Sequence, residues 1–188
     1  MNRSFAAKSD AHPVPSWTGR LDDWLPAAPA AAAAWLSEPG LLTERLRTCC
    51  RGETALVVVS EAEAPLAAED VALLRAAGSA AFVREIELTC DGRPWVFAQT
   101  LIPQATLARQ RWLTTLGRAA LGERLAAVPG IERGPLEYAR LAAGGRLYRR
   151  ALRERPDPPA ALWARRSWYA IEGHRLLVQE VFLPESHA

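Results

Sequence analysis

Two charged residues, Arg84 and Glu180, stand in segments that otherwise have the composition of buried β-strands. Strand alternation places Arg84 on the same face as Phe82 and Ile86, and its guanidinium can donate two parallel hydrogen bonds to a carboxylate. Glu180 lies within the apolar run 176–183, where an ionised carboxylate is costly unless it is paired. A cation and an acid held on rigid strands could bind a small organic acid and handle a proton.

Each of these residues also has an ordinary structural explanation. Arg84 could pair with Glu180, or with another acid, as an internal ion pair. Glu180 could lie at a solvated strand edge. The residue pattern alone leaves these alternatives open.

The two residues belong to two copies of one unit, 84–103 and 165–184, each of which reads as a β-hairpin with a glycine in its turn. Matching positions in the two copies are Arg84 and Arg165, Gly92 and Gly173, Gln99 and Glu180, and Pro103 and Pro184. One hairpin therefore offers a carboxylate where the other offers a neutral amide. Such a break in an apolar strand is a place to seek function.

Other segments complete the expected fold. Helices are expected within 30–47, with a break at Pro39-Gly40, and at 65–77, 106–116 and 119–127. Strands are expected at 54–60 (buried), 80–90, 93–102 and 136–141, in addition to the second hairpin, and 149–159 reads as a solvated loop. The pattern predicts a single α+β domain on an antiparallel sheet of about six strands.

The composition fits one soluble globular domain, with 188 residues, 49% hydrophobic content and a net charge of +2. We expect a flexible arm at 1–19 and the domain at 20–188. No apolar run is long enough to span a bilayer, so we expect no membrane insertion. Lys8 is the only lysine, and the small net charge argues against nucleic acid as a partner.

The cysteines and histidines indicate neither a disulfide framework nor a metal site. Cys49 and Cys50 are neighbours and the count of three is odd, so we expect a reducing, cytoplasmic environment and treat Cys90 as a core residue. The three histidines lie far apart, without the spacing of metal ligands. No phosphate loop or dinucleotide motif is present, so no cofactor is expected.

Several longer stretches resemble the chorismate pyruvate-lyase family, over roughly residues 20–186. The stretches that carry the resemblance are 84–86, 91–95, 162–167 and 180–184, with weaker matches at 35–36, 41–46, 116–117 and 121–122. The order and spacing of these motifs make the resemblance specific.

The resemblance implies an enzyme that converts chorismate into 4-hydroxybenzoate and pyruvate, as the first step of ubiquinone biosynthesis, and that acts as a monomer without a cofactor. It also implies helical flaps over a buried ligand. By the same resemblance Arg84 binds the ligand carboxylate, Glu180 contacts its 4-hydroxyl, and the backbone amides of Leu42 and Leu121 bind the carboxylate. On composition alone the two leucines would be helix-packing residues.

Two other functions are compatible with parts of the sequence. A small-molecule sensor domain of a bacterial transcription regulator would share this fold and bind without turnover. A nucleic-acid binder could use the arginines of 146–155 together with Arg165 and Arg166, although we expect these two to be supporting salt bridges or a basic rim.

Overall fold

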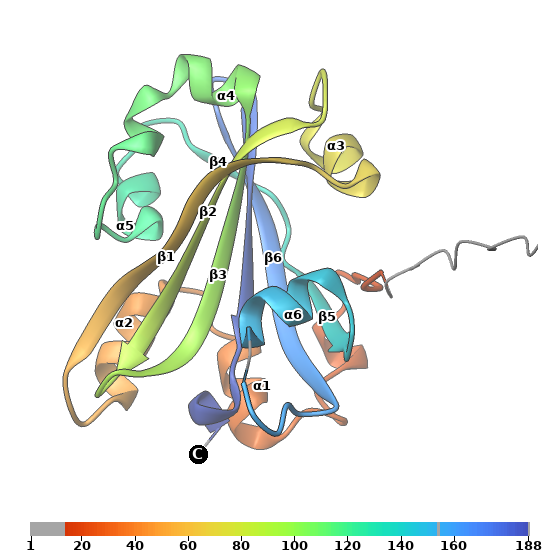
Figure 1. The fold of residues 1–188 in the computed structure, drawn as a ribbon, viewed down its shortest axis with the longest axis vertical. Coiled ribbons are helices and arrows are strands. Elements are labelled where there is room, and N and C mark those ends of the chain that lie inside the picture. The colour runs from red at the N-terminus through yellow and green to blue at the C-terminus, as the bar shows by residue number, and fades with distance from the viewer. Residues whose placement is uncertain (1–13, 154, 188) are drawn as a thin grey trace, which may run out of the picture.

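Two long β-hairpins form the centre of the structure, as the internal repeat predicted. In this computed structural model, β2 (Ala80–Cys90) and β3 (Arg93–Pro103) make the first hairpin, and β6 (Ala161–Ile171) and β7 (His174–Phe182) make the second. Figure 1 shows their strands running along most of the length of the molecule. The structure describes residues 14–153 and 155–187.

Each hairpin turns through two residues with positive φ. Asp91 and Gly92 have φ of 48° and 72°, and Glu172 and Gly173 have φ of 51° and 79°. Two consecutive residues with positive φ are what a type I′ turn requires, and glycine at the second place adopts this conformation without a Cβ clash.

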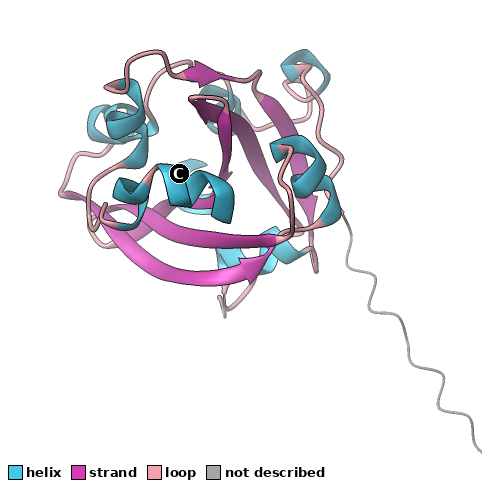
Figure 2. Cartoon of the chain, turned by 90° about the horizontal axis from the view of Figure 1, so that it is seen from above, coloured by secondary structure: helices cyan, strands magenta, loops and turns pink. Residues whose placement is uncertain are grey.

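The hairpins join edge to edge because β3 pairs with β7, and all pairings are antiparallel. The sheet has seven strands in the described residues, in the order β1 (Thr54–Pro65), β2, β3, β7, β6, β4 (Glu132–Arg133), and β5 (Glu137–Ala142) also pairs with β6. Seen from above in Figure 2, the sheet is curved rather than flat. The α+β fold with an antiparallel sheet is confirmed, and the short β4 was not predicted.

Helices cover both faces of the sheet. One face carries α1 (Ala30–Leu36), α2 (Leu42–Cys49) and α5 (Leu121–Ala126), and the other carries α3 (Ala68–Leu74) and α6 (Arg146–Leu152). Shorter helical elements are η1 (Leu21–Asp23), α4 (Gln104–Arg109), η2 (Arg111–Thr114) and η3 (Pro184–His187). None of the helices in the described part of the chain is long and apolar enough to cross a membrane.

Trp35 fixes the first helical region against the sheet. Its ring centroid lies 5.9 Å from that of Phe182 on β7, and both side chains are buried. The Trp35 Nε1–H donates to the carbonyl oxygen of Ser186 at 2.9 Å. The contact between the two buried aromatic rings holds α1 on the sheet, and the hydrogen bond from the Trp35 N–H joins α1 to η3.

Three local predictions were wrong. The segment 149–159 was expected to be a solvated loop, but its first residues belong to α6, since the buried Leu147, Tyr148, Ala151 and Leu152 share one helical face. The strand predicted at 54–60 extends to Pro65 and, as an edge strand, is only partly buried. The helix predicted at 106–116 is divided between α4 and η2.

The predicted arm is packed against the domain at its end. The backbones of Thr18 and Tyr138 form two hydrogen bonds, with N to O distances of 3.0 and 2.7 Å. The Cζ atom of Arg166 lies over the Trp17 ring, 4.5 Å from the ring centroid. Residues 1–13, which make up most of the predicted arm, lie outside the described residues, so the arm stays a prediction.

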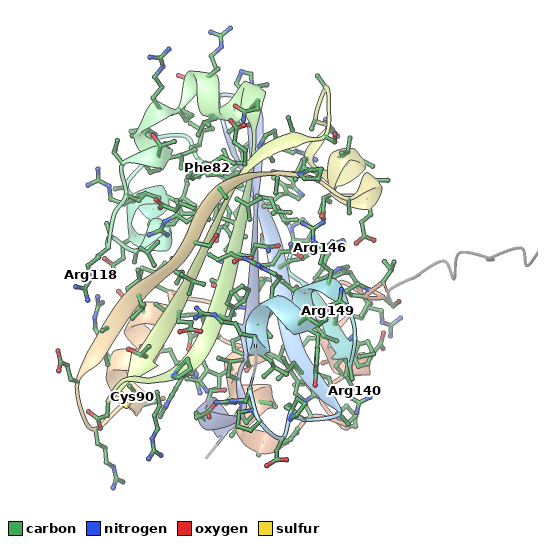
Figure 3. The ribbon with its side chains drawn as sticks, in the orientation of Figure 1. Phe82, Cys90, Arg118, Arg140, Arg146 and Arg149 are labelled. Carbon is green, nitrogen blue, oxygen red and sulfur yellow. A yellow bond between two sulfur atoms is a disulfide. The ribbon has the colours of Figure 1, made fainter. Side chains whose placement is uncertain are left out.

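Cys50 and Cys90 form a disulfide with a Cα–Cα distance of 5.7 Å. It joins the end of α2 to the end of β2, and Figure 3 shows Cys90 far along the strand from Phe82. We predicted no disulfide because two of the three cysteines are adjacent, but the fold brings Cys90 to Cys50 and leaves Cys49 as the free thiol. The cysteines therefore no longer support a reducing compartment.

A bulge breaks the equivalence of the two hairpins. The register between β2 and β3 shifts between Leu88 and Thr89, whereas β6 and β7 pair without a shift. Because β3 has one extra residue at this point, each side chain of β3 after the bulge lies on the face opposite to that of the matching side chain of β7. Thr100, not Gln99, is therefore the structural counterpart of Glu180, and Gln99 lies on the other face, where its Nε2 donates to Glu85 at 2.8 Å.

Buried polar residues cross the sheet on the face that α3 and α6 cover. Glu85, Gln99 and Gln179 are linked by side-chain hydrogen bonds, and Gln179 is opposite Arg166 on the next strand. Asp70 of α3 lies with Oδ1 3.7 Å from Arg166 Nη1 and makes no hydrogen bond through that atom among the described residues. Burial, together with nearby Glu69, raises the pKa of Asp70 to about 6 although Arg166 opposes the shift.

Asp70 should make stability depend on pH. The folded state holds the Asp70 proton more tightly than the unfolded chain, where aspartate has a pKa of about 3.9. The contribution of protonated Asp70 to the free energy of unfolding is therefore fully present below about pH 4 and is lost as the pH rises through about 6. The free energy of unfolding of Asp70→Asn, relative to that of the wild type, should therefore rise by roughly 2–3 kcal/mol between pH 4 and pH 7. Urea unfolding at several pH values measures this, with Asp157→Asn, an exposed aspartate at positive φ, as the control. Parallel curves for wild type and Asp70→Asn would contradict the assignment.

Candidate active site

A cavity of about 170 Å³ lies between the sheet and the first residues of α2 and α5. Its sheet side is largely apolar, with Ile86, Leu88, Val96, Ala98 and Val178. An apolar cavity of about 150 Å³ in another protein holds benzene. This cavity therefore has the size of a ligand with one six-membered ring.

All four residues predicted to bind the ligand line this cavity. Arg84 comes from β2, Glu180 from β7, Leu42 from α2 and Leu121 from α5. The sequence separates them widely, and the fold brings them to one cavity. Arg84 and Glu180 are on strands with β3 between them, which corresponds to about 10 Å across the sheet.

Arg84 is held by three acceptors and is only 1% exposed. Its Nε donates to Glu61 Oε1 at 3.0 Å, and its Nη2 donates to the carbonyl oxygens of Gly117 and Ala119 at 2.7 and 3.4 Å. Nη1 makes no hydrogen bond with any described residue. The guanidinium is thus fixed in place and still has N–H groups for a ligand carboxylate.

Glu180 is bound to a different arginine. Arg165 Nε donates to Glu180 Oε2 at 2.6 Å, and β7 is an inner strand of the sheet. Of the two alternatives from the sequence, the first is confirmed in the form of a pair with another acid, because Arg84 pairs with Glu61 rather than Glu180. The second is wrong, because Glu180 is not on an edge strand. The charge-assisted bond to Arg165 keeps Glu180 as an oriented acceptor beside the cavity.

Arg165 is a cavity residue rather than part of a basic rim. It is 1% exposed, it lines the cavity, and besides Glu180 it donates through Nη1 to the carbonyl oxygens of Trp35 and Glu38. The predicted salt bridge is present and the predicted rim is wrong. Arg166, the next residue, points to the other face, where its Nε donates to Glu137 at 2.7 Å.

Leu42 and Leu121 are the first residues of α2 and α5, and both are buried. The N–H groups at the start of a helix have no acceptor within the helix, so they can donate to a ligand. Their side chains form part of the cavity wall and exclude water from it. Thr43 and Leu125 continue this wall.

Tyr169 and Arg133 also line the cavity and were not predicted. Burial raises the pKa of Tyr169, so the hydroxyl stays neutral and can donate a hydrogen bond. The carbon of the Arg133 guanidinium lies 5.5 Å from the Tyr169 ring centroid, and its Nη1 donates to Pro39. Strand alternation from Arg165 could have identified Tyr169, but the two-residue strand β4 gives no pattern that identifies Arg133.

Solved structures with the same fold include an effector domain and a repressor domain. The effector domain of PhnF from Mycobacterium smegmatis matches 78% of this chain and 90% of its own, with a TM-score of 0.53 and 14% identity. The C-terminal domain of the histidine utilization repressor from Pseudomonas syringae pv. tomato matches 72% of this chain and 95% of its own, with a TM-score of 0.50 and 12% identity. At these identities the likeness shows the fold alone.

Sequence relatives are much closer. A protein of Thiobacillus denitrificans named "Probable chorismate pyruvate-lyase" is 41% identical over 166 residues, which cover 86% of this chain and 88% of the relative. One of the same name from Dechloromonas aromatica is 40% identical over 154 residues, covering 80% and 85%. The family model described as chorismate lyase matches residues 16–187. This chain therefore belongs to the chorismate lyase family.

Proposed function

We propose that this protein is a chorismate pyruvate-lyase, which converts chorismate into 4-hydroxybenzoate and pyruvate. The observation that carries the proposal is the cavity of one-ring size that Arg84 and Glu180 both face, each held by its own partner. The similarity to relatives that carry this name supports it. We expect the reaction to supply ubiquinone biosynthesis, and we expect a cytoplasmic monomer that needs no cofactor.

The reaction requires few groups. The bond between the ring and the enolpyruvyl ether oxygen breaks, the ring loses the proton at C4, and the electron pair of that C–H bond completes the aromatic ring. The departing enolpyruvate takes up a proton and becomes pyruvate. Because aromatisation makes the products much more stable, the protein has only to hold the substrate, exclude water and assist the proton transfer.

The four predicted contacts divide this work. Arg84 and the amides of Leu42 and Leu121 bind the ring carboxylate, and the apolar wall excludes water. Glu180 lies near the 4-hydroxyl end, where it orients the ring and accepts the C4 proton. The Arg165 ion pair keeps the Glu180 carboxylate pointed into the cavity.

A sensor domain is the second candidate, because the solved structures of the same fold include regulator domains. A sensor would bind chorismate or its product without turnover. Mixing the purified protein with chorismate distinguishes the two, since the lyase releases 4-hydroxybenzoate and pyruvate in equal amounts. Absence of both products, with ligand binding intact, would favour the sensor.

Arg84→Lys should weaken binding of the ligand carboxylate. Lysine keeps the charge but cannot serve Glu61, the Gly117 carbonyl and a ligand together, as the planar guanidinium does. Loss of one charge-assisted bond, about 1.5–3 kcal/mol, corresponds to a rise of about 10- to 150-fold in the Kd for 4-hydroxybenzoate. Calorimetric titration measures the Kd. Arg150→Lys is the control, because Arg150 binds Glu85 on the other face of the sheet, and an equal loss in both variants would refute a specific role for Arg84.

Glu180→Gln should separate proton transfer from binding. Glutamine has the same shape but is a poor proton acceptor, so kcat should fall by about 10²- to 10⁴-fold while the Kd for 4-hydroxybenzoate changes by less than about tenfold. Steady-state kinetics and titration measure the two quantities. Glu137→Gln, which alters a glutamate paired with Arg166 on the other face, serves as the control. Unchanged turnover in Glu180→Gln would eliminate the proton-transfer role.

A further inference from the structure

We propose that Arg165 is the positioning residue of this site, which holds both the Glu180 carboxylate and the segment leading to Leu42 in their ligand-binding arrangement. The inference deepens the proposed function and rests on it. It assigns to Arg165 control over two of the four ligand contacts, although Arg165 need not bind the substrate carboxylate itself.

The contacts of Arg165 reach two separate parts of the site. Its Nε donates to Glu180 Oε2 at 2.6 Å, which fixes the acid on β7. Its Nη1 donates to the carbonyl oxygen of Trp35, at the end of α1, at 3.4 Å, and to that of Glu38, in the segment between α1 and α2. Residues 39–41 of this segment line the cavity and lead directly to Leu42. One buried side chain therefore joins Glu180 to the segment 37–41, which covers one side of the cavity and is called a covering segment below, as is 117–120 before Leu121.

Arg84 shows the same arrangement on the other side of the cavity. It pairs through Nε with a glutamate on the adjacent strand, Glu61, and donates through one terminal nitrogen to two carbonyls, those of Gly117 and Ala119. These carbonyls precede Leu121, as those of Trp35 and Glu38 precede Leu42. Arg84 and Arg165 are also the matching positions of the internal repeat, so the two hairpins each hold one covering segment by an arginine.

Leu42 and Leu121 lie in the cavity wall, so movement of the segments that precede them would widen the path by which a ligand enters or leaves. Movement of 37–41 away from the sheet breaks the bond from Arg165 to the Glu38 carbonyl. A guanidinium can keep the Glu180 ion pair while this bond breaks, because different nitrogens serve the two sides. Arg165 therefore sets how readily this segment opens and leaves Glu180 oriented throughout.

Arg165→Lys tests the proposal, with Arg166→Lys as the matched control. Both arginines are buried on β6 and pair through Nε with a glutamate, but Arg166 faces the other side of the sheet. In Arg165→Lys, amide hydrogen exchange at residues 37–42 should accelerate at least about tenfold, and 4-hydroxybenzoate should dissociate at least about tenfold faster. Exchange at 117–121, which Arg84 holds, should stay within about twofold of the wild type.

Two outcomes separate the proposals from each other. If the wild type releases no 4-hydroxybenzoate from chorismate but Arg165→Lys shows the selective exchange at 37–42, the proposed function fails and the positioning role stands. If the wild type is active and Arg165→Lys matches Arg166→Lys in exchange and product dissociation, the positioning role is overturned.

Arginine side-chain NMR of the wild type decides the question if Arg165→Lys does not fold. The guanidinium protons of Arg165 should exchange with water slowly and accelerate only when the covering segment opens. Exchange as fast as that of Arg118, which is exposed and points away from the molecule in Figure 3, would overturn the positioning role.

Discussion

The site depends on keeping two arginine side chains almost fully out of water. Arg84 and Arg165 are each 1% exposed, and an unpaired buried cation would cost several kcal/mol. The fold compensates each one with a glutamate on the neighbouring strand and with backbone carbonyls of a covering segment. The backbone acceptors lie in segments that continue into the cavity lining at 39–41 and 120–122, so burial of these charges and covering of the cavity are coupled.

The bulge in β3 explains why two similar hairpins do different work. Without it, Gln99 would face the cavity opposite Arg84, as Glu180 faces it opposite Arg165. The extra residue turns Gln99 to the other face, into the polar row with Glu85 and Gln179, and places Thr100 at the cavity instead. The cavity therefore carries one acid on its inner strands, and the acid that pairs with Arg84 comes from the edge strand β1.

Local patterns in the sequence predicted much of the fold. The hairpins, their turns and the helix pair around Pro39 follow from alternation, glycine position and composition, which act over a few residues. The missing features depend on long-range contacts. Arg165 and the Glu38 carbonyl are 127 residues apart, and a backbone acceptor leaves no mark on residue type. The Cys50–Cys90 disulfide and the role of Arg133 likewise depend on which segments the folded chain brings together.

The charge around the cavity favours an anionic ligand. Arg84, Arg133 and Arg165 face Glu180 and Glu61, so three cations meet two acids and one positive charge remains in excess. Arg133 supplies that excess, since the other two arginines are paired with glutamates, and it lies on the more exposed side with Tyr169. The proposed substrate, chorismate, has two carboxylates, and each proposed product has one. A fixed Arg84 for the ring carboxylate and a more exposed Arg133 for the enolpyruvyl carboxylate would match this distribution of charge. After bond cleavage the pyruvate would then lie on the side with access to water, and the aromatic product would stay beneath the covering segments.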